Sequence, residues 1–200
     1  MAGGPMDKIH KNCRLILRVL LLPVLPLVLS LNMQQVMAFE GDYVWEARFE
    51  TSLAKARSGH QAKDQYAVGD MYLRGRGTAK NAAKALYWFL LAAEQGHRKA
   101  AYKAGYLYLH SEGLSPGASP KQALPWIRKA ALAGYAPAQY ELGRLFFSGK
   151  VVRRSEPQAL KWLGRARAAN YAPARKAFDQ MVKRLVKTQT AFVDQNRAAK

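Results

Sequence analysis

The side chains of this 200-residue chain with the clearest potential for catalysis or metal binding are its histidines and carboxylates. Beyond residue 38 the histidines are His60, His97 and His110, and their spacing fits no metal-ligand pattern. The carboxylates are scattered with no obvious acid–base pair, and the sequence has no nucleophile elbow or phosphate-binding loop. His60 and His97 fall in predicted turns, where a solvated histidine is the expected state. The sequence therefore predicts a binding protein without cofactor or metal, although a carboxylate pair assembled from distant segments stays open.

The net charge is the second feature with chemical consequences. The chain has 32 Lys and Arg against 13 Asp and Glu, a formal net charge of +19. Such an excess favours anionic partners and makes association with them sensitive to salt. For a single cation, solvation of an outer helix face is the simpler interpretation, whereas for clusters solvation and binding stay open as equal alternatives. The clusters are Arg153 with Arg154, Arg165 with Arg167, and Lys183 with Arg184 and Lys187.

An internal repeat positions these side chains. Tryptophans recur after 38 and then 36 residues, and glycines recur after 36 and then 38. The extra residues therefore lie between Gly105 and Trp126, in a segment rich in Gly, Ser and Pro, which predicts a longer loop in the second unit. A fixed period of this length is typical of a solenoid of stacked helical units. The markers are Trp88, Trp126 and Trp162 together with Gly69, Gly105 and Gly143.

Each unit is predicted to contain two antiparallel helices. Apolar and aromatic residues of the first helix recur at helical spacing, as Tyr66, Val68 and Tyr72 do in the first unit. The marker glycine lies inside this helix, where glycine costs about 1 kcal/mol relative to alanine. Because every unit has glycine here despite this cost, we expect the second helix to approach the first closely at the glycine. Ser119 with Gln122 and Ser155 with Gln158 predict capping boxes at the start of second helices.

These motifs resemble the Sel1-like repeat, a relative of the tetratricopeptide repeat. The resemblance covers roughly residues 61–178 and rests on VGDMY at 68–72, GRG at 75–77 and the Ala-Leu-x-Trp segments that begin at 85, 123 and 159. Asp179 stands where a fourth unit would need glycine, so the array is expected to end there. The resemblance implies an all-α, right-handed α/α solenoid of about three Sel1-like repeats with N- and C-terminal capping helices.

The two ends of the chain have different expected roles. Basic residues precede an apolar run at 19–31, and Ala38 ends a small-residue motif, which indicates a secretory signal peptide cleaved after Ala38. An uncleaved anchor is the alternative, and the only cysteine, Cys13, leaves with a cleaved signal. Either way the repeats are expected to be exported, to the periplasm or beyond. The expected organisation is a signal peptide at 1–38, an N-terminal capping helix at 39–60, repeats at 61–97, 98–135 and 136–171, and a C-terminal capping helix with a polar tail at 172–200.

The resemblance also implies a location for partner binding. In tetratricopeptide-type arrays the inner face comes from the first helices, and here that face would be a groove of aromatics among cations. Tyr66, Tyr102 and Tyr140 occupy the same repeat position, where packing between units is the favoured interpretation. Stronger candidates are the side chains that break the repeat pattern, namely Tyr106, His110, Arg144 and Phe147. The full implied partner-binding set is Lys63, Lys99, Tyr102, Tyr106, His110, Tyr140, Arg144, Phe147, Lys176 and Lys183, and Tyr66 and Asp70 share the same face.

Three functions follow from these expectations. The first is a non-enzymatic scaffold or adaptor of the bacterial cell envelope that binds a protein partner with acidic and apolar groups through this groove. The alternative is an envelope protein that binds a polyanion, either peptidoglycan, lipopolysaccharide or exopolysaccharide. A hydrolase is the least favoured function. Outside the cytoplasm nucleic acid is not an expected partner, and no membrane span is expected after signal cleavage.

Overall fold

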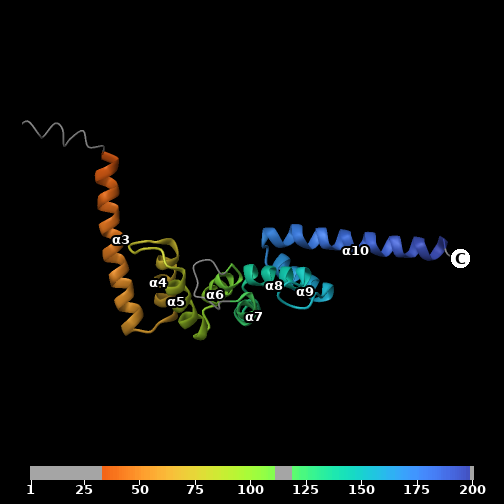
Figure 1. Ribbon diagram of the computed structural model, residues 1–200, viewed down its shortest axis with the longest axis horizontal. Coiled ribbons are helices and arrows are strands. Elements are labelled where there is room, and N and C mark those ends of the chain that lie inside the picture. Colours follow the sequence, from red (N-terminus) through yellow and green to blue (C-terminus); the bar gives the residue numbers. More distant parts are fainter. Residues whose placement is uncertain (1–32, 111–118, 199–200) are drawn as a thin grey trace, which may run out of the picture. The chain divides into compact units, whose positions relative to one another are not determined.

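The computed structural model describes residues 33–110 and 119–198, which form helices joined by turns (Figure 1). No strand occurs among these described residues. The expected longer loop of the second unit falls at 111–118, outside the described residues. The helices are α3 (Met33–Ser58), α4 (Ala62–Arg74), α5 (Ala82–Glu94), α6 (Arg98–His110), the short 3-10 helix η1 (Pro120–Gln122), α7 (Ala123–Leu132), α8 (Ala136–Ser148), α9 (Glu156–Ala168) and α10 (Ala172–Ala198).

The chain divides into two compact units, residues 1–47 and 48–200. The described part of the first unit, residues 33–47, belongs to α3. Most of the predicted signal peptide lies outside the described residues, and the predicted cleavage position after Ala38 falls within α3. No helix in the described part of the chain is long and apolar enough to cross a membrane. Export and signal cleavage stay predictions.

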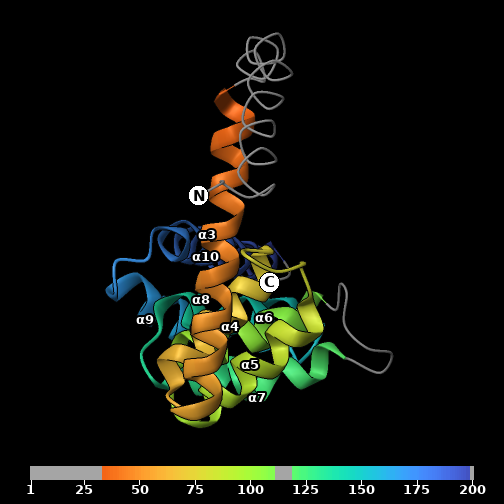
Figure 2. The same cartoon turned by 90° about the vertical axis from the view of Figure 1, so that its left-hand side faces the viewer.

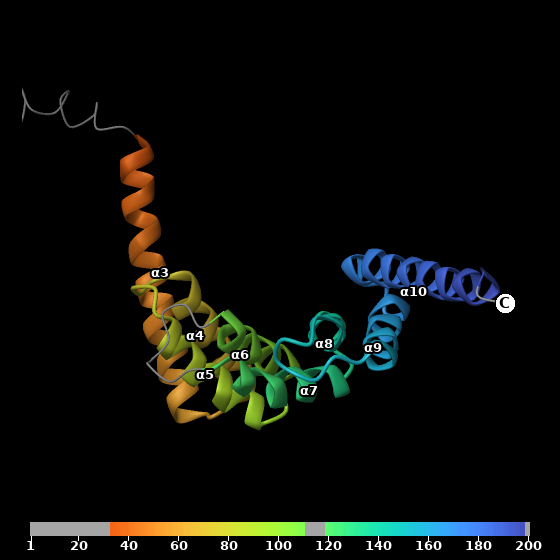
Figure 3. The ribbon, with the colours of Figure 1, turned by 45° about the vertical axis from the view of Figure 1, so that its right-hand side comes forward.

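The second unit is built from helix pairs that pack in chain order. α4 packs on α5, α6 on α7 and α8 on α9, and successive pairs meet through α5 with α6, α7 with α8, and α9 with α10. Figure 3 shows this succession, and in the view of Figure 2 α5 and α7 lie below α4 and α6. The expected all-α solenoid of helix pairs is therefore confirmed.

The marker glycines lie where the two helices of a pair come closest. A Cβ atom on Gly69 would stand 2.7 Å from the ring of Phe89 and 3.2 Å from the carbonyl oxygen of Ala85. In the other two pairs the equivalent glycine has a carbonyl oxygen at the same 3.2 Å and an aliphatic side chain at 2.6 or 2.8 Å. Interiors this tightly packed have no room for an added methyl group. The expected close approach is thus confirmed in all three pairs, the others being Gly105 with Ile127 and Gly143 with Leu163.

Aromatic rings fill the junctions between successive pairs. The ring of Tyr66 stacks on His97 with 4.7 Å between centroids, and two equivalent tyrosine pairs have centroid distances of 5.4 and 5.5 Å. His97 is half-buried, and its Nδ1 accepts a hydrogen bond of 3.1 Å from the Ala100 N–H at the start of α6. The expectation of a solvated loop histidine is therefore wrong for His97, because its position faces the preceding pair. It holds for His60, which is exposed. The equivalent pairs are Tyr102 with Tyr135 and Tyr140 with Tyr171.

The predicted capping boxes differ in outcome. Ser119 and Gln122 form both reciprocal bonds between side chain and backbone, as expected. Ser155 forms only one, because its hydroxyl accepts the Gln158 N–H at 3.4 Å while its own N–H donates to the Phe146 carbonyl at 2.9 Å. The Ser155 N–H is thus already satisfied by the preceding helix, and the second half of the box has no donor left.

Other helices cover both ends of the array. The last turns of α3 bury Phe49 and Leu53, and the Phe49 ring meets the Tyr72 ring edge-on with 5.1 Å between centroids. At the other end α10 packs on α9 and buries Met181. Asp179 of α10 takes the place of the marker glycine and is exposed, and the described residues contain no further helix to pack there. The end of the array at this position stays a prediction.

Candidate functional site

The C-terminal half of α8 lines two adjoining cavities. The larger, called the inner cleft, has a volume of about 640 Å³ and lies between the ends of α6 and α8. The smaller, called the α10 pocket, has a volume of about 300 Å³ and lies between α8, α9 and α10. Arg144 and Phe147 line both. The other residues of the inner cleft are Leu109, His110, Pro120, Glu141, Leu145, Ser148, Lys150 and Val151, and those of the α10 pocket are Tyr140, Leu163, Ala177, Gln180, Met181 and Arg184.

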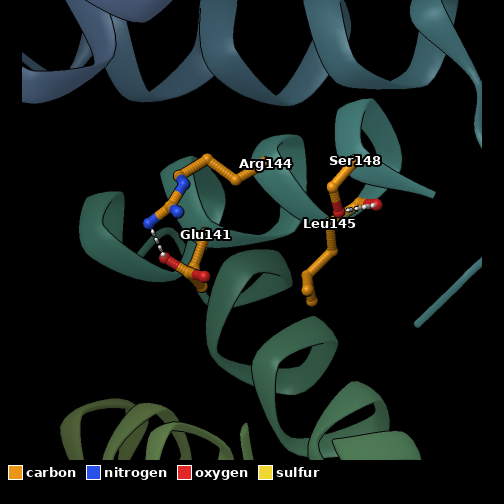
Figure 4. Close-up of polar contacts among 4 residues, drawn as sticks. All are labelled: Glu141, Arg144, Leu145 and Ser148. Carbon is orange, nitrogen blue, oxygen red and sulfur yellow. Dashed lines mark hydrogen bonds and ion pairs between the residues drawn. The ribbon is translucent and has the colours of Figure 1, made fainter. Parts of the chain in front are cut away.

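Arg144 projects from the exposed face of α8. Its Nη1 lies 3.4 Å from Oε2 of Glu141, as Figure 4 shows, and its guanidinium carbon lies 5.8 Å from the centroid of Tyr140. The Arg144 side chain is 59% exposed, and an ion pair this exposed contributes only about 0–1 kcal/mol. The hydroxyl of Ser148 is turned away and donates to the Leu145 carbonyl at 3.2 Å. A ligand can therefore reach most of the Arg144 guanidinium.

Phe147 connects the two cavities and is flanked by cations. The guanidinium carbons of Arg154 and Arg184 each lie 5.6 Å from the centroid of its half-buried ring. Arg154 also pairs with Glu156 at 2.6 Å, whereas Arg184 has no ion pair among the described residues. Cation–π contacts at exposed sites are worth about 0.5–1 kcal/mol each. A ring next to two guanidinium groups suits a ligand that presents apolar and acidic groups together.

Tyr102, near Glu141 of the inner cleft, has a shifted pKa. Burial raises the pKa of the Tyr102 phenol, and the nearby Glu141 carboxylate adds to the rise, so this hydroxyl stays neutral at physiological pH. Within residues 33–110 and 119–198, no group of three His, Cys, Asp or Glu side chains could hold a metal ion. The arrangement offers apolar surface, cation–π contacts and cations that can pair with carboxylates.

The repeat units can be compared with known families. The model of the Sel1 repeat matches residues 62–97, 98–135 and 136–171, more than half of the chain. The chain belongs to the Sel1 repeat family. Proteins with Sel1 repeats generally mediate protein–protein interactions, and the fold is typically a non-catalytic scaffold. The sequence matches none of the curated proteins.

Solved structures of Sel1 proteins have the same fold. One is the crystal structure of a Sel1 repeat protein from Oxalobacter formigenes, with a TM-score of 0.61, 29% identity and coverage of 73% of this chain and 58% of that one. Another is c5321, described as a protective antigen present in uropathogenic Escherichia coli strains and displaying an SLR fold, with a TM-score of 0.57, 30% identity and coverage of 68% of this chain. The present chain spans only 58% and 33% of the lengths of these two proteins.

The Sel1 repeats bring some of the predicted partner-binding residues together. His110, Arg144 and Phe147 meet at the inner cleft, and Tyr140 joins the latter two in the α10 pocket. Tyr106 lines neither cavity, but it is 42% exposed on α6 and its ring centroid lies 4.1 Å from that of His110. Tyr102 is half-buried at a repeat junction. The four predicted lysines are exposed but line neither cavity; they are Lys63, Lys99, Lys176 and Lys183.

Some residues of the inner cleft and the α10 pocket were not predicted as site residues, because only the tertiary structure brings them there. Arg184 was visible only as one member of a cationic cluster, yet it lines the α10 pocket while its neighbour Lys183 does not. Its helical spacing from Ala177 and Met181 is the signal that could have found it, because positions separated by four and three residues share one helix face. The other missed residues are Glu141 and Gln180. Arg154 was likewise visible only within a cationic cluster, and it contacts the Phe147 ring without lining either cavity.

Proposed function

We propose that this chain is a non-enzymatic scaffold of the bacterial cell envelope that binds a protein partner through the inner cleft. The observation that carries the proposal is the convergence of His110, Arg144 and Phe147 on one cleft of about 640 Å³. Packing of the repeats does not account for His110 and Arg144, which are exposed, whereas Phe147 is half-buried and also packs against the core cluster under α10. Arginine and aromatic residues are also the types that dominate binding energy at protein interfaces.

The envelope location rests on the N-terminal sequence. A basic segment, an apolar run at 19–31 and the small residue Ala38 form the pattern of a secretory signal peptide. The solved Sel1 structures described above come from bacteria, and one of them is described as a protective antigen. An exported Sel1 protein would meet its partner in the periplasm or outside the cell.

A double variant tests the role of the inner cleft. A tagged full-length chain is crosslinked in cells, and we expect one dominant protein to copurify at near-equal stoichiometry. Arg144→Glu with Phe147→Ala should abolish this capture, because it reverses the charge and removes the ring shared by both cavities. Arg128→Glu with Leu132→Ala is the matched control, since both residues are exposed on α7 and line neither cavity.

Circular dichroism must show equal helix content in both double variants for this comparison to hold. Capture that survives in the Arg144 and Phe147 variant would overturn the assignment of the cleft. Capture that is lost in both variants would show a requirement for overall positive charge and would equally contradict a specific cleft.

The distribution of charge favours a second candidate, a polyanion-binding envelope protein. Between residues 150 and 187 the only acidic residues are Glu156 and Asp179, whereas Lys and Arg are frequent. Most of these cations are exposed. Binding to isolated cell wall or lipopolysaccharide should then weaken steeply as salt rises from about 0.05 M to about 0.5 M, because salt screens exposed charges. Tight binding that salt does not affect would count against this candidate.

A further inference from the structure

The α10 pocket combines an apolar floor with a cationic rim. Leu163 and Met181 are each 3% exposed and belong to the core under α10, so they hold the floor in place. The rings of Tyr140 and Phe147 form apolar walls. The flexible thioether of a methionine lets such a floor adapt to the shape of an inserted group. With about 300 Å³ the pocket is at the lower end of ligand-site volumes, which suits one inserted side chain.

The rim of the pocket is positive, and no carboxylate is among the residues that line it. Arg144 and Arg184 both line it, and of the two only Arg144 has a carboxylate partner among the described residues. Glu141 pairs with Arg144 from outside the pocket at 3.4 Å, and Asp179 lies 3.8 Å from Arg167. Arg184 itself has no ion pair among the described residues.

The first repeat provides an internal comparison for this rim. By the repeat spacing, Gln180 and Arg184 of α10 correspond to Asp70 and Arg74 of α4. In α4 the carboxylate of Asp70 lies 2.7 Å from Nε of Arg74, so that arginine is neutralised within its own helix. In α10 glutamine replaces the aspartate, and the arginine charge is left for a group from outside.

We propose that the α10 pocket receives one aromatic or long aliphatic side chain of a protein partner, and that carboxylates beside this side chain pair with Arg144 and Arg184. The inference rests on the proposed scaffold function and names the chemistry of the partner segment. An apolar side chain fills the floor of the pocket, while flanking carboxylates supply the negative charge that the rim lacks. Arginine contributes directional hydrogen bonds to such carboxylates.

Methyl NMR of the full-length chain labelled with ¹³C at its methionine methyl groups tests this proposal. The probe is a tripeptide of glutamate, phenylalanine and glutamate, blocked at both ends. We expect a saturable shift of the Met181 methyl signal, assigned with Met181→Leu, and no shift of the Met71 signal, because Met71 lies in α4 and lines neither cavity. Tripeptides with a central alanine, or with glutamines in place of the glutamates, should bind with an affinity at least about tenfold lower.

Two variants on α10 locate the charge that matters. Arg184→Gln should weaken binding of the tripeptide about tenfold, whereas Lys187→Gln removes the same charge from an exposed site outside the pocket and should leave binding unchanged. The proposal is overturned if the Met181 signal does not move, if the alanine or glutamine tripeptides bind equally well, or if Arg184→Gln has no effect.

The result can be separated from failure of the proposed function. If Arg144→Glu with Phe147→Ala abolishes partner capture but the tripeptide leaves the Met181 signal unmoved, the inner cleft stands and the α10 pocket is not the contact. If the double variant captures the partner normally, the proposed binding through the inner cleft fails, whatever the tripeptide does.

Discussion

The glycine inside the first helix of each repeat has a steric role. Gly69→Ala should lower the free energy of unfolding by about 1–3 kcal/mol, because its Cβ would stand 2.7 Å from the ring of Phe89, which is fully buried. Gly164→Ala is the matched control, since its Cβ would meet only the Phe178 ring at 3.5 Å. The better helix propensity of alanine should then raise stability by about 0.5–1 kcal/mol. Urea unfolding measures both changes, and equal effects would contradict the steric role.

His97 is the residue at which one repeat junction differs from the others. The equivalent residues Tyr135 and Tyr171 provide a ring alone, whereas neutral His97 provides a ring and also accepts the Ala100 N–H. Burial lowers the pKa of His97, and the adjacent cations Lys99 and Arg98 lower it further. A proton on Nδ1 would remove the acceptor and place a charge at the start of α6, where the helix dipole is positive.

Stability should therefore depend on pH through His97. Because the folded-state pKa lies below the unfolded value of 6.5, the unfolded chain takes up the proton first as pH falls. The contribution of neutral His97 is complete above about pH 6.5 and declines below it. Urea unfolding at about pH 7.5 and about pH 5 should show a smaller fall in stability for His97→Tyr than for the unmodified chain. An identical fall in both would exclude His97 as the cause.

At the scale of whole elements, α10 has two roles that can be separated. Its first half covers α9 and supplies Met181 to the core, and the same segment forms one wall of the α10 pocket. Beyond Lys187, none of the residues whose side chains the structure describes belongs to that core cluster or lines either cavity. The end of a stacked array needs such a cover, because an uncovered repeat exposes its apolar face.

Truncation should distinguish the two parts of α10. A chain that ends at Lys187 should remain soluble and unfold at nearly the same temperature as the full chain. A chain that ends at Tyr171 should unfold at a lower temperature or aggregate, because Leu163 and Phe147 lose their cover. Thermal unfolding followed by circular dichroism makes the comparison. Equal stability of the two truncated chains would show that α10 is not a structural cap.

The elements differ in how far the sequence predicts them. The helix pairs and their close contacts follow from local patterns repeated in each unit, such as Gly69 opposite the segment that contains Phe89. The α10 pocket depends instead on the rotation of α10 against α8, which brings Arg184 to the rim and leaves Lys183 outside. The burial of His97 was not predicted for a related reason. It follows a turn, and the sequence around that turn does not show that the Tyr66 ring packs on it.

At the scale of the whole molecule, positive charge is spread over the surface, whereas cations and aromatic rings lie together in one region. The formal net charge is +19, yet the predicted lysines are dispersed over exposed helix faces and line neither cavity. Cations and aromatic rings meet around Arg144 and Phe147. Non-specific attraction would use all the cations, whereas recognition of one partner would use this region. The two possibilities predict different contact sites on the protein.

Site-specific photocrosslinking in cells tests the central claim most directly. A photoreactive phenylalanine analogue replaces either Tyr106, which is 42% exposed beside the inner cleft, or Tyr87, which is 58% exposed on α5. We expect position 106 to form one discrete protein adduct that Arg144→Glu abolishes, and position 87 to form none. The same adduct from position 87, or an adduct at 106 that Arg144→Glu leaves intact, would contradict partner binding through the inner cleft.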